Sequence, residues 1–245
     1  HVQHRWGVSS FDHAASARIW ARGDRVTYTF QFRDVFASWQ FLLQGLVVTL
    51  YLSAVTMLFG LAIGVAGAAA RLYGPGWLRS AVAAYVEIIR NTPLIVQLFI
   101  VFFGLPSLGV RLDALTAALI SLTINLGAYC IEIVRAGLQA VPKPQIEAGH
   151  SLGLSGFQVF RYIILMPSLK MMFPALASQF VLLMLATSIA SQISVAELFH
   201  AASIIQSRTF RDFEVYTVVG VVYLALALIF RGLFALIHAR LFARR

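Results

Sequence analysis

The sequence predicts an all-α membrane protein, built as a bundle of about five transmembrane helices. Of its 245 residues, 60% are hydrophobic and only 12% are charged, which is about half the charged share of an ordinary soluble domain. Long stretches carry no formal charge, and residues 35–70 and 171–196 are the longest of them. Because a spanning helix needs roughly 20 mostly apolar residues, these stretches favour membrane spans over a soluble core.

The spans are expected to be helical, because backbone groups in lipid must form their hydrogen bonds within their own segment. The apolar stretches also lack the alternation of a membrane β-barrel. A tail and interfacial segment, residues 1–40, precedes the transmembrane domain, residues 41–245. We place the spans at residues 41–70, 80–104, 113–136, 170–192 and 214–238, with a long loop, 138–169, between the third and the fourth.

The formal net charge is +9, but the basic residues gather at span ends, which indicates membrane topology rather than nucleic-acid binding. One side of the membrane receives Arg71, Arg79, Arg135, Lys143, Arg161, Lys170, Arg231, Arg240, Arg244 and Arg245. The other side receives Arg111, Arg208 and Arg211. The positive-inside rule therefore predicts a cytoplasmic 138–169 loop and C-terminus, and five spans then place the N-terminus outside.

The tail has no apolar core of the kind that a signal peptide carries. Residues 26–32 alternate like a strand, but a lone strand in a tail is unstable, so a segment in the lipid headgroup layer is the better interpretation. Aromatic residues suit that layer, and here they are Phe30, Phe32, Phe36 and Trp39. No metal site is expected from the tail histidines His1, His4 and His13, because they lack partners at ligand spacing.

The loop 138–169 has its own internal order. Pro142 and Pro144 end the third span, because the residue before a proline resists helix. A short helix is expected over about 145–152, and Gly153 can end it in a left-handed conformation. Ser155 is a plausible N-cap for a second helix, 156–165, which turns back toward the membrane. An ordinary solvated loop is the alternative.

The residues of this loop carry a resemblance. Glu147-Ala148-Gly149, Gly153 six residues after the Glu, and then Ile163 and Leu165 resemble the EAA loop of ABC-importer permeases. Three more stretches, residues 85–98, 127–137 and 187–198, are similar to spans of the polar amino-acid permease family. The departures are Gly149 where Ala is usual, Met166 where Pro is usual, and Leu185-Ala186 where Lys-Asp often stands.

The resemblance implies a type I importer permease subunit of the bacterial cytoplasmic (inner) membrane, with several partners. They are an ATP-binding cassette ATPase dimer, a second permease subunit that is identical or a non-identical homologue, an external solute-binding protein and membrane lipid. The ATPase would use ATP and Mg, while this chain binds no cofactor and is no enzyme, since it has no phosphate-binding loop. The ATPase-coupling residues would be Glu147, Ala148, Gly149, Leu152 and Gly153, where the two small residues let the helix enter a groove on the partner and Glu147 offers it a charge.

Ionisable and polar residues inside the spans are a second set of candidates, because they are costly in lipid and usually functional. They are Glu87, Arg90 and Gln97 in the second span and Asn125, Glu132 and Arg135 in the third. Spacing places Glu87, Arg90 and Gln97 on one helical face. We favour an interhelical charge network that braces the bundle, and a lining of the substrate path is the alternative.

Thr187, Ser188 and Gln192 gather near the end of the fourth span, where they either contact a polar solute or bond across helices. Pro93 and Pro174 each remove a backbone bond within a span, which predicts a bend. A secondary transporter or channel subunit driven by an ion gradient is the other functional class, with Glu87 and Glu132 as proton carriers. The sequence alone does not name the solute.

Overall fold

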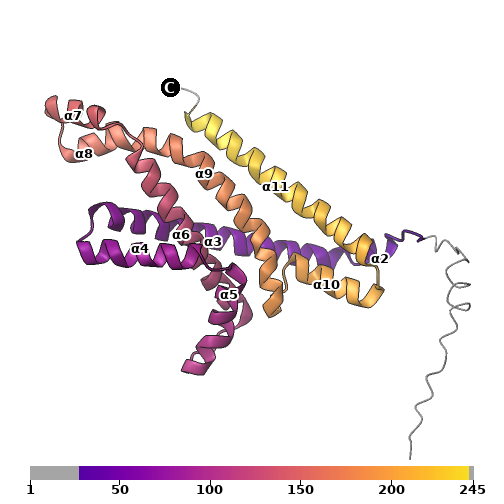
Figure 1. The fold of residues 1–245 in the computed structure, drawn as a ribbon. Helices are drawn as coiled ribbons and strands as arrows, with labels where there is room; N and C mark the ends of the chain where they lie inside the picture. Colours follow the sequence, from indigo (N-terminus) through magenta and orange to yellow (C-terminus); the bar gives the residue numbers. More distant parts are fainter. Residues whose placement is uncertain (1–27, 243–245) are drawn as a thin grey trace, which may run out of the picture. The chain divides into compact units, whose positions relative to one another are not determined.

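The computed structural model describes residues 28–242, and every regular element in this range is helical. The predictions for His1, His4 and His13 and for the tail up to residue 27 concern residues outside the described range. Residues 28–31 belong to a separate unit and form neither helix nor strand, and the helical unit begins at Phe32. The all-α prediction is therefore confirmed (Figure 1).

The helical unit consists of ten α-helices within the described range, joined by short turns of other helix types. The α-helices are α2 (Arg33–Ala37), α3 (Trp39–Tyr73), α4 (Gly76–Arg90), α5 (Leu94–Phe99), α6 (Ala114–Gln139), α7 (Lys143–Ser151), α8 (Gly156–Val159), α9 (Leu165–Ala186), α10 (Leu198–Thr209) and α11 (Asp212–Phe242). The other turns are the π-helical Ile100–Gly104 and Phe160–Ile164 and the 3-10 helices Leu105–Leu108 and Thr187–Ile193.

Four helical segments are long and apolar enough to cross a membrane, and a fifth span is possible only as a bent pair. The four are Trp39–Tyr73, Ala114–Gln139, Gly156–Ile193 and Asp212–Phe242. The pair consists of Gly76–Arg90 and Leu94–Leu108, which meet at an angle of 107°. The second span, expected over 80–104, is thus broken at Pro93, where a bend was predicted. This proline has no N–H to continue the ladder, and it disfavours helix in the residue before it.

Two other boundaries differ from the sequence-based expectation. The helix that begins at Gly156 does not stop at residue 165 but runs through the π-helical turn into the fourth span, so this span is much longer than 170–192. Helix α10 was not expected at all, because its 12 residues lie where a simple outer loop was assumed. It packs against the first half of α3 and against α11 and closes that end of the bundle.

Helices α3 and α6 form the centre of the bundle, because small residues let their backbones approach closely. A side chain at Gly60 would lie 2.7 Å from the Leu126 side chain, and one at Gly64 would collide with Cys130. Gly127 of α6 in turn accommodates Ile63 of α3. Cys130 is fully buried in this seam.

One end of the bundle gathers the last turns of α6 and α11. Phe242, the last residue of α11, packs its ring 5.9 Å from that of Phe173, which lies in the first half of α9. Helix α7 connects α6 to the start of this α8–α9 segment, so α7 and the end of α11 belong to the same end (Figure 1). Helix α10 and the start of α3 lie at the other end, where a side chain at Gly45 would meet Glu197 O at 2.9 Å.

Candidate functional site

Helix α7 is held by a fixed turn at its C-terminal end. The Leu154 N–H donates to Gly149 O and the Gly153 N–H to His150 O, with Gly153 in the left-handed region at φ 76°. This pair of bonds is a Schellman motif, which satisfies carbonyls that the helix end would leave free. The prediction that Gly153 ends the helix is confirmed.

The chain re-enters helix directly after this turn. The Gln158 N–H donates to Ser155 Oγ at 3.3 Å, and the Ser155 N–H donates to Gln158 Oε1 at 2.8 Å. This reciprocal capping box fixes the start of the next helix, so the predicted N-cap at Ser155 is confirmed. The two ends of a loop of four residues are thus both fixed by hydrogen bonds, which gives α7 a defined position at the tip of the long α9 segment.

Gly149 faces inward, toward its own chain, while its expected part in letting the helix enter a groove on a partner stays a prediction. It is buried, and a side chain at this position would collide with Ile163 and approach Val159 at 3.3 Å. Its small size therefore seats α7 on its own chain. Glu147 and Ala148, by contrast, are exposed.

Two large apolar side chains follow Glu147 in the sequence and are exposed. Leu152 is 81% exposed and Phe157 is 76% exposed. They lie on either side of the turn at residues 153–155, so the tip of the loop presents two exposed apolar side chains. Exposed apolar side chains on a rigid support are the kind of surface that enters a groove of another protein.

A groove follows the seam between α6 and α9, and we call it the α6–α9 groove. Its first cavity, of about 240 Å³, is lined by Leu94, Asn125, Leu126, Tyr129, Gln179, Leu182, Leu183 and Ala186. Its second, of about 560 Å³, is lined by Arg90, Glu132, Ile133, Ala136, Gly137, Ala140, Met171, Met172 and Ala175. The lining residues follow one another at helical spacing along both helices, and the break of the second span separates Arg90 from Leu94. Asn125 thus lines the first cavity, and Arg90 and Glu132 line the second.

Gln97 bridges the break in the second span. Its Nε2 donates to Ile89 O at 2.8 Å and to Thr92 O at 3.1 Å, on the far side of Pro93. Its Oε1 accepts a hydrogen bond from Asn125 Nδ2 at 3.0 Å. The expectation that Gln97 shares a helical face with Glu87 and Arg90 was wrong, because the chain turns at the proline. Its amide instead donates hydrogen bonds to carbonyls that the break leaves without a helical partner, and it links this break to Asn125 of α6.

An ion pair among the candidate charges of the second and third spans lies within one helix: Glu132 pairs with Arg135 at 2.6 Å, while Glu87 is exposed and accepts a hydrogen bond from Asn91 Nδ2. Between α4 and α6, the Arg90 guanidinium lies 5.3 Å from the centre of the Tyr129 ring, and the Tyr85 hydroxyl donates to Ile124 O. These two contacts join the helices, and the interhelical charge network stays a prediction.

The polar residues at the end of the fourth span lie apart from the lining of the α6–α9 groove. Thr187 is buried and donates to Met184 O, and Ser188 donates to Leu185 O. Gln192 is exposed, and its Nε2 contacts Ser191 Oγ at 3.4 Å. All three lie in the 3-10 helix Thr187–Ile193, and the Thr187 and Ser188 hydroxyls bond to carbonyls of the last turn of α9. Their part in a solute path stays a prediction.

Sequence reasoning missed a buried carboxylate at the opposite end of the bundle. Glu197 is fully buried and accepts hydrogen bonds from the N–H groups of Phe199 and His200 and from the Tyr223 hydroxyl at 2.8 Å. Burial raises the pKa of its carboxyl against the effect of these bonds. The residue caps α10 and joins it to α11. An acidic residue directly before a periodic apolar run is an N-cap signal, and it could have revealed both the helix and its cap.

Residues 60–243 match the protein family described as "Binding-protein-dependent transport system inner membrane component". Among curated proteins, the glutamine transport system permease protein GlnP of Escherichia coli K12 is 38% identical over 191 residues, which are 77% of this chain and 87% of that protein. The L-cystine transport system permease protein TcyB of Bacillus subtilis is 39% identical over 170 residues, 69% of this chain and 73% of that protein.

Solved structures agree. A chain from a crystal structure of an amino acid ABC transporter with histidines superposes with a TM-score of 0.82 at 35% identity, over 87% of this chain and 100% of the other. A chain of the MetNI methionine ABC transporter in an inward facing conformation superposes at 0.71 with 21% identity, over 84% and 98%, and supports the fold alone. The resemblance inferred from the EAA-like loop is confirmed. The chain belongs to the family of inner membrane components of binding-protein-dependent transport systems.

Proposed function

We propose that this chain is the permease subunit of an ATP-driven importer for polar amino acids or related small solutes. The match with this chain covers most of the length of relatives that are named as glutamine and L-cystine permeases. These names support the proposed class of solute. In this assignment the chain spans the bacterial inner membrane several times, with its N-terminus outside and its C-terminus in the cytoplasm. It carries solute and catalyses no reaction itself.

The observation that carries the proposal is the geometry of α7. The helix lies at the end of the bundle and is fixed by hydrogen bonds at the turn after it. Glu147 of this helix, Leu152 directly after it and Phe157 of α8 are exposed. A dimer of ATP-binding cassette ATPases docks on this surface and on its counterpart in a second permease subunit, identical or homologous. ATP and Mg are used in that dimer. Because α7 is seated on the α9 segment through Gly149 and Ile163, a displacement of α7 moves a spanning helix.

The α6–α9 groove is the half of the solute path that this chain supplies. Asn125, Tyr129 and Gln179 offer an amide, a phenol and a second amide to a polar solute, and Arg90 and Glu132 follow toward the α7 end. An external solute-binding protein delivers its cargo at the opposite end, near α10. Rigid-body movement of the two subunits then exposes the groove to one side at a time.

The proposal is tested by solute uptake into proteoliposomes that contain the assembled transporter and its binding protein. Uptake is expected to require ATP on the side of the membrane where the ATPase lies. It should be lost in the variant Glu147→Arg. The matched control is Asp34→Arg, which makes the same charge change on an exposed residue of α2 at the other end of the bundle, and it should transport normally.

The same assay separates the proposal from an ion-gradient transporter or channel. Uptake that collapses with an uncoupler while ATP is held constant would contradict an ATP-driven importer and favour proton transfer through Glu132. Uptake that persists with the uncoupler and stops without ATP supports the importer.

A further inference from the structure

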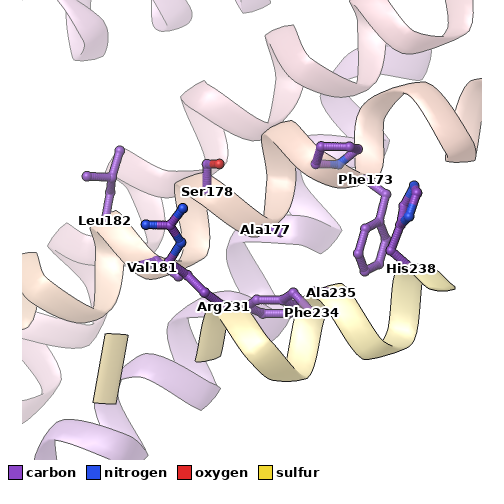
Figure 2. A pocket seen from close by; sticks show the side chains of 10 residues that line it. Phe173, Ala177, Ser178, Val181, Leu182, Arg231, Phe234, Ala235 and His238 are labelled. Carbon is purple, nitrogen blue, oxygen red and sulfur yellow. The ribbon is translucent and has the colours of Figure 1, made fainter. Parts of the chain in front are cut away.

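A third cavity lies between α9 and α11, separate from the α6–α9 groove apart from their shared Leu182. It has a volume of about 610 Å³ and is lined by Phe173, Pro174, Ala177, Ser178, Val181, Leu182, Arg231, Phe234, Ala235 and His238. Figure 2 shows the Arg231 side chain extending from α11 toward the Ser178 and Leu182 side of α9. Apart from Leu182, no coupling or path residue considered above lines this cavity, and no step of the proposed transport cycle uses it.

The lining combines one charged edge with an apolar wall. Arg231 and His238 are two turns apart on α11, and Phe234 lies between them on the same face. The rings of Phe173 and His238 lie 5.7 Å apart, and those of Phe173 and Phe234 lie 6.3 Å apart. The cavity therefore offers cationic and aromatic groups along one side of an otherwise aliphatic space.

No acidic side chain can neutralise Arg231 from either helix that forms the cavity. Helix α9 contains no Asp or Glu, and the acids of α11, Asp212 and Glu214, lie in its first turn. Glu214 is about 26 Å from Arg231 along the helix axis. Within residues 28–242, the ion pairs are those of Glu132 and Glu214 with other arginines.

An arginine on a lipid-facing helix is costly without a counter-charge. Only 11% of the most apolar window of α11 is buried within the chain, so the cavity is bounded by a helix that faces its surroundings. Arg231 lies two to three turns before the end of α11 that also carries Arg240. Basic cavities between spanning helices at the basic end of a bundle bind the headgroups of anionic lipids.

We propose that this cavity is a binding site for an anionic phospholipid of the leaflet at the α7 end of the bundle. The lipid phosphate accepts hydrogen bonds from Arg231 and His238, and Arg231 supplies the counter-charge, since a guanidinium presents donors in a fork that suits phosphate oxygens. An acyl chain lies along Phe173, Phe234 and Val181. A zwitterionic lipid offers the same phosphate with an attached cation, so the site prefers an anionic headgroup.

The test is native mass spectrometry of the purified transporter assembly, titrated after delipidation with phosphatidylglycerol or phosphatidylcholine of the same acyl chains. The wild type is expected to bind phosphatidylglycerol more tightly. Arg231→Gln should weaken that binding about fivefold, on the scale of one basic residue at a membrane surface. Arg231→Lys should retain most of it. The control Arg240→Gln removes a charge from the same helix outside the cavity and should change the affinity much less.

Equal binding of both lipids by the wild type would overturn the site, and so would equal losses in Arg231→Gln and Arg240→Gln. Arg231→Gln could instead change the number of permease subunits in the assembly, which would identify this face as a protein contact and overturn lipid binding. A third outcome is that the Arg231→Gln assembly no longer binds labelled solute but still binds the lipid. That outcome would assign the cavity to the solute and overturn the lipid site. Because lipid binding is read without transport, the result stands independently of the proposed importer activity.

Discussion

The guanidinium of Arg90 lies 5.3 Å from the centre of the Tyr129 ring, so the last turn of α4 contacts the middle of α6 by a cation–π interaction. This contact sits at the border between the two cavities of the α6–α9 groove. It holds the charged end of a broken span against the most buried of the candidate spans.

Tyr129→Leu is expected to destabilise the bundle by about 1 kcal/mol, because the ring face that attracts the guanidinium is lost. Tyr129→Phe keeps the ring and is the matched control. Thermal unfolding of the detergent-purified assembly measures both variants. Equal destabilisation by Leu and Phe would show that the hydroxyl, rather than the ring, carries the effect.

Gly64→Leu is expected to prevent the close approach of α3 and α6, because any side chain at this position collides with Cys130. Overpacking of a tight core typically costs about 1–3 kcal/mol, and the contact here involves the helix that centres the bundle. Gly220→Leu is the control, since a side chain there meets nothing within 4 Å. Membrane yield and thermal unfolding should fall for the first variant alone.

Glu197→Ala is expected to destabilise the α10 end of the bundle by about 3 kcal/mol, because it strands two helix N–H groups and the Tyr223 hydroxyl in a buried site. Tyr223→Phe removes one of these bonds and should cost less. The double variant should be less destabilised than the sum of the two single changes. Strict additivity in thermal unfolding would contradict a shared hydrogen-bond cluster.

Gly149→Leu and Leu152→Asp should separate the packing of α7 from its docking. The first change forces α7 away from Ile163 and should lower both the stability of the assembly and its ATPase activity. The second alters a side chain that is 81% exposed, so it should leave thermal unfolding of the chain unchanged while reducing ATPase stimulation by the solute-loaded binding protein. A stability loss in Leu152→Asp alone would contradict this division.

Most of the fold could be predicted from the sequence, because the length of an apolar stretch and the residue types of a turn or cap are local signals. Charge-free stretches located the first, third and fifth spans within a few residues, and Gly153 and Ser155 acted as local turn and cap signals. The bend at Pro93 was anticipated, but its size of 107° was not, because it depends on Gln97 and Asn125 satisfying the broken backbone across helices.

Long-range pairing explains the other differences. The sequence suggested that Gly149 lets α7 enter a groove on a partner protein. In the structure, its small size lets α7 pack against Ile163 of the following helix. Glu87 and Arg135 carry complementary charges, yet each finds its partner on its own helix or turn. Such choices depend on which faces meet, and a single sequence does not contain that information.

Photo-crosslinking from position 152 tests the central claim most directly. A benzophenone amino acid replaces Leu152 in the assembled transporter, and the control replaces Leu108, which is 78% exposed in the turn before α6 at the opposite end. We predict a crosslink from position 152 to the ATPase subunit and none to it from position 108. A crosslink to the ATPase from position 108, or to the external binding protein from position 152, would contradict docking on α7.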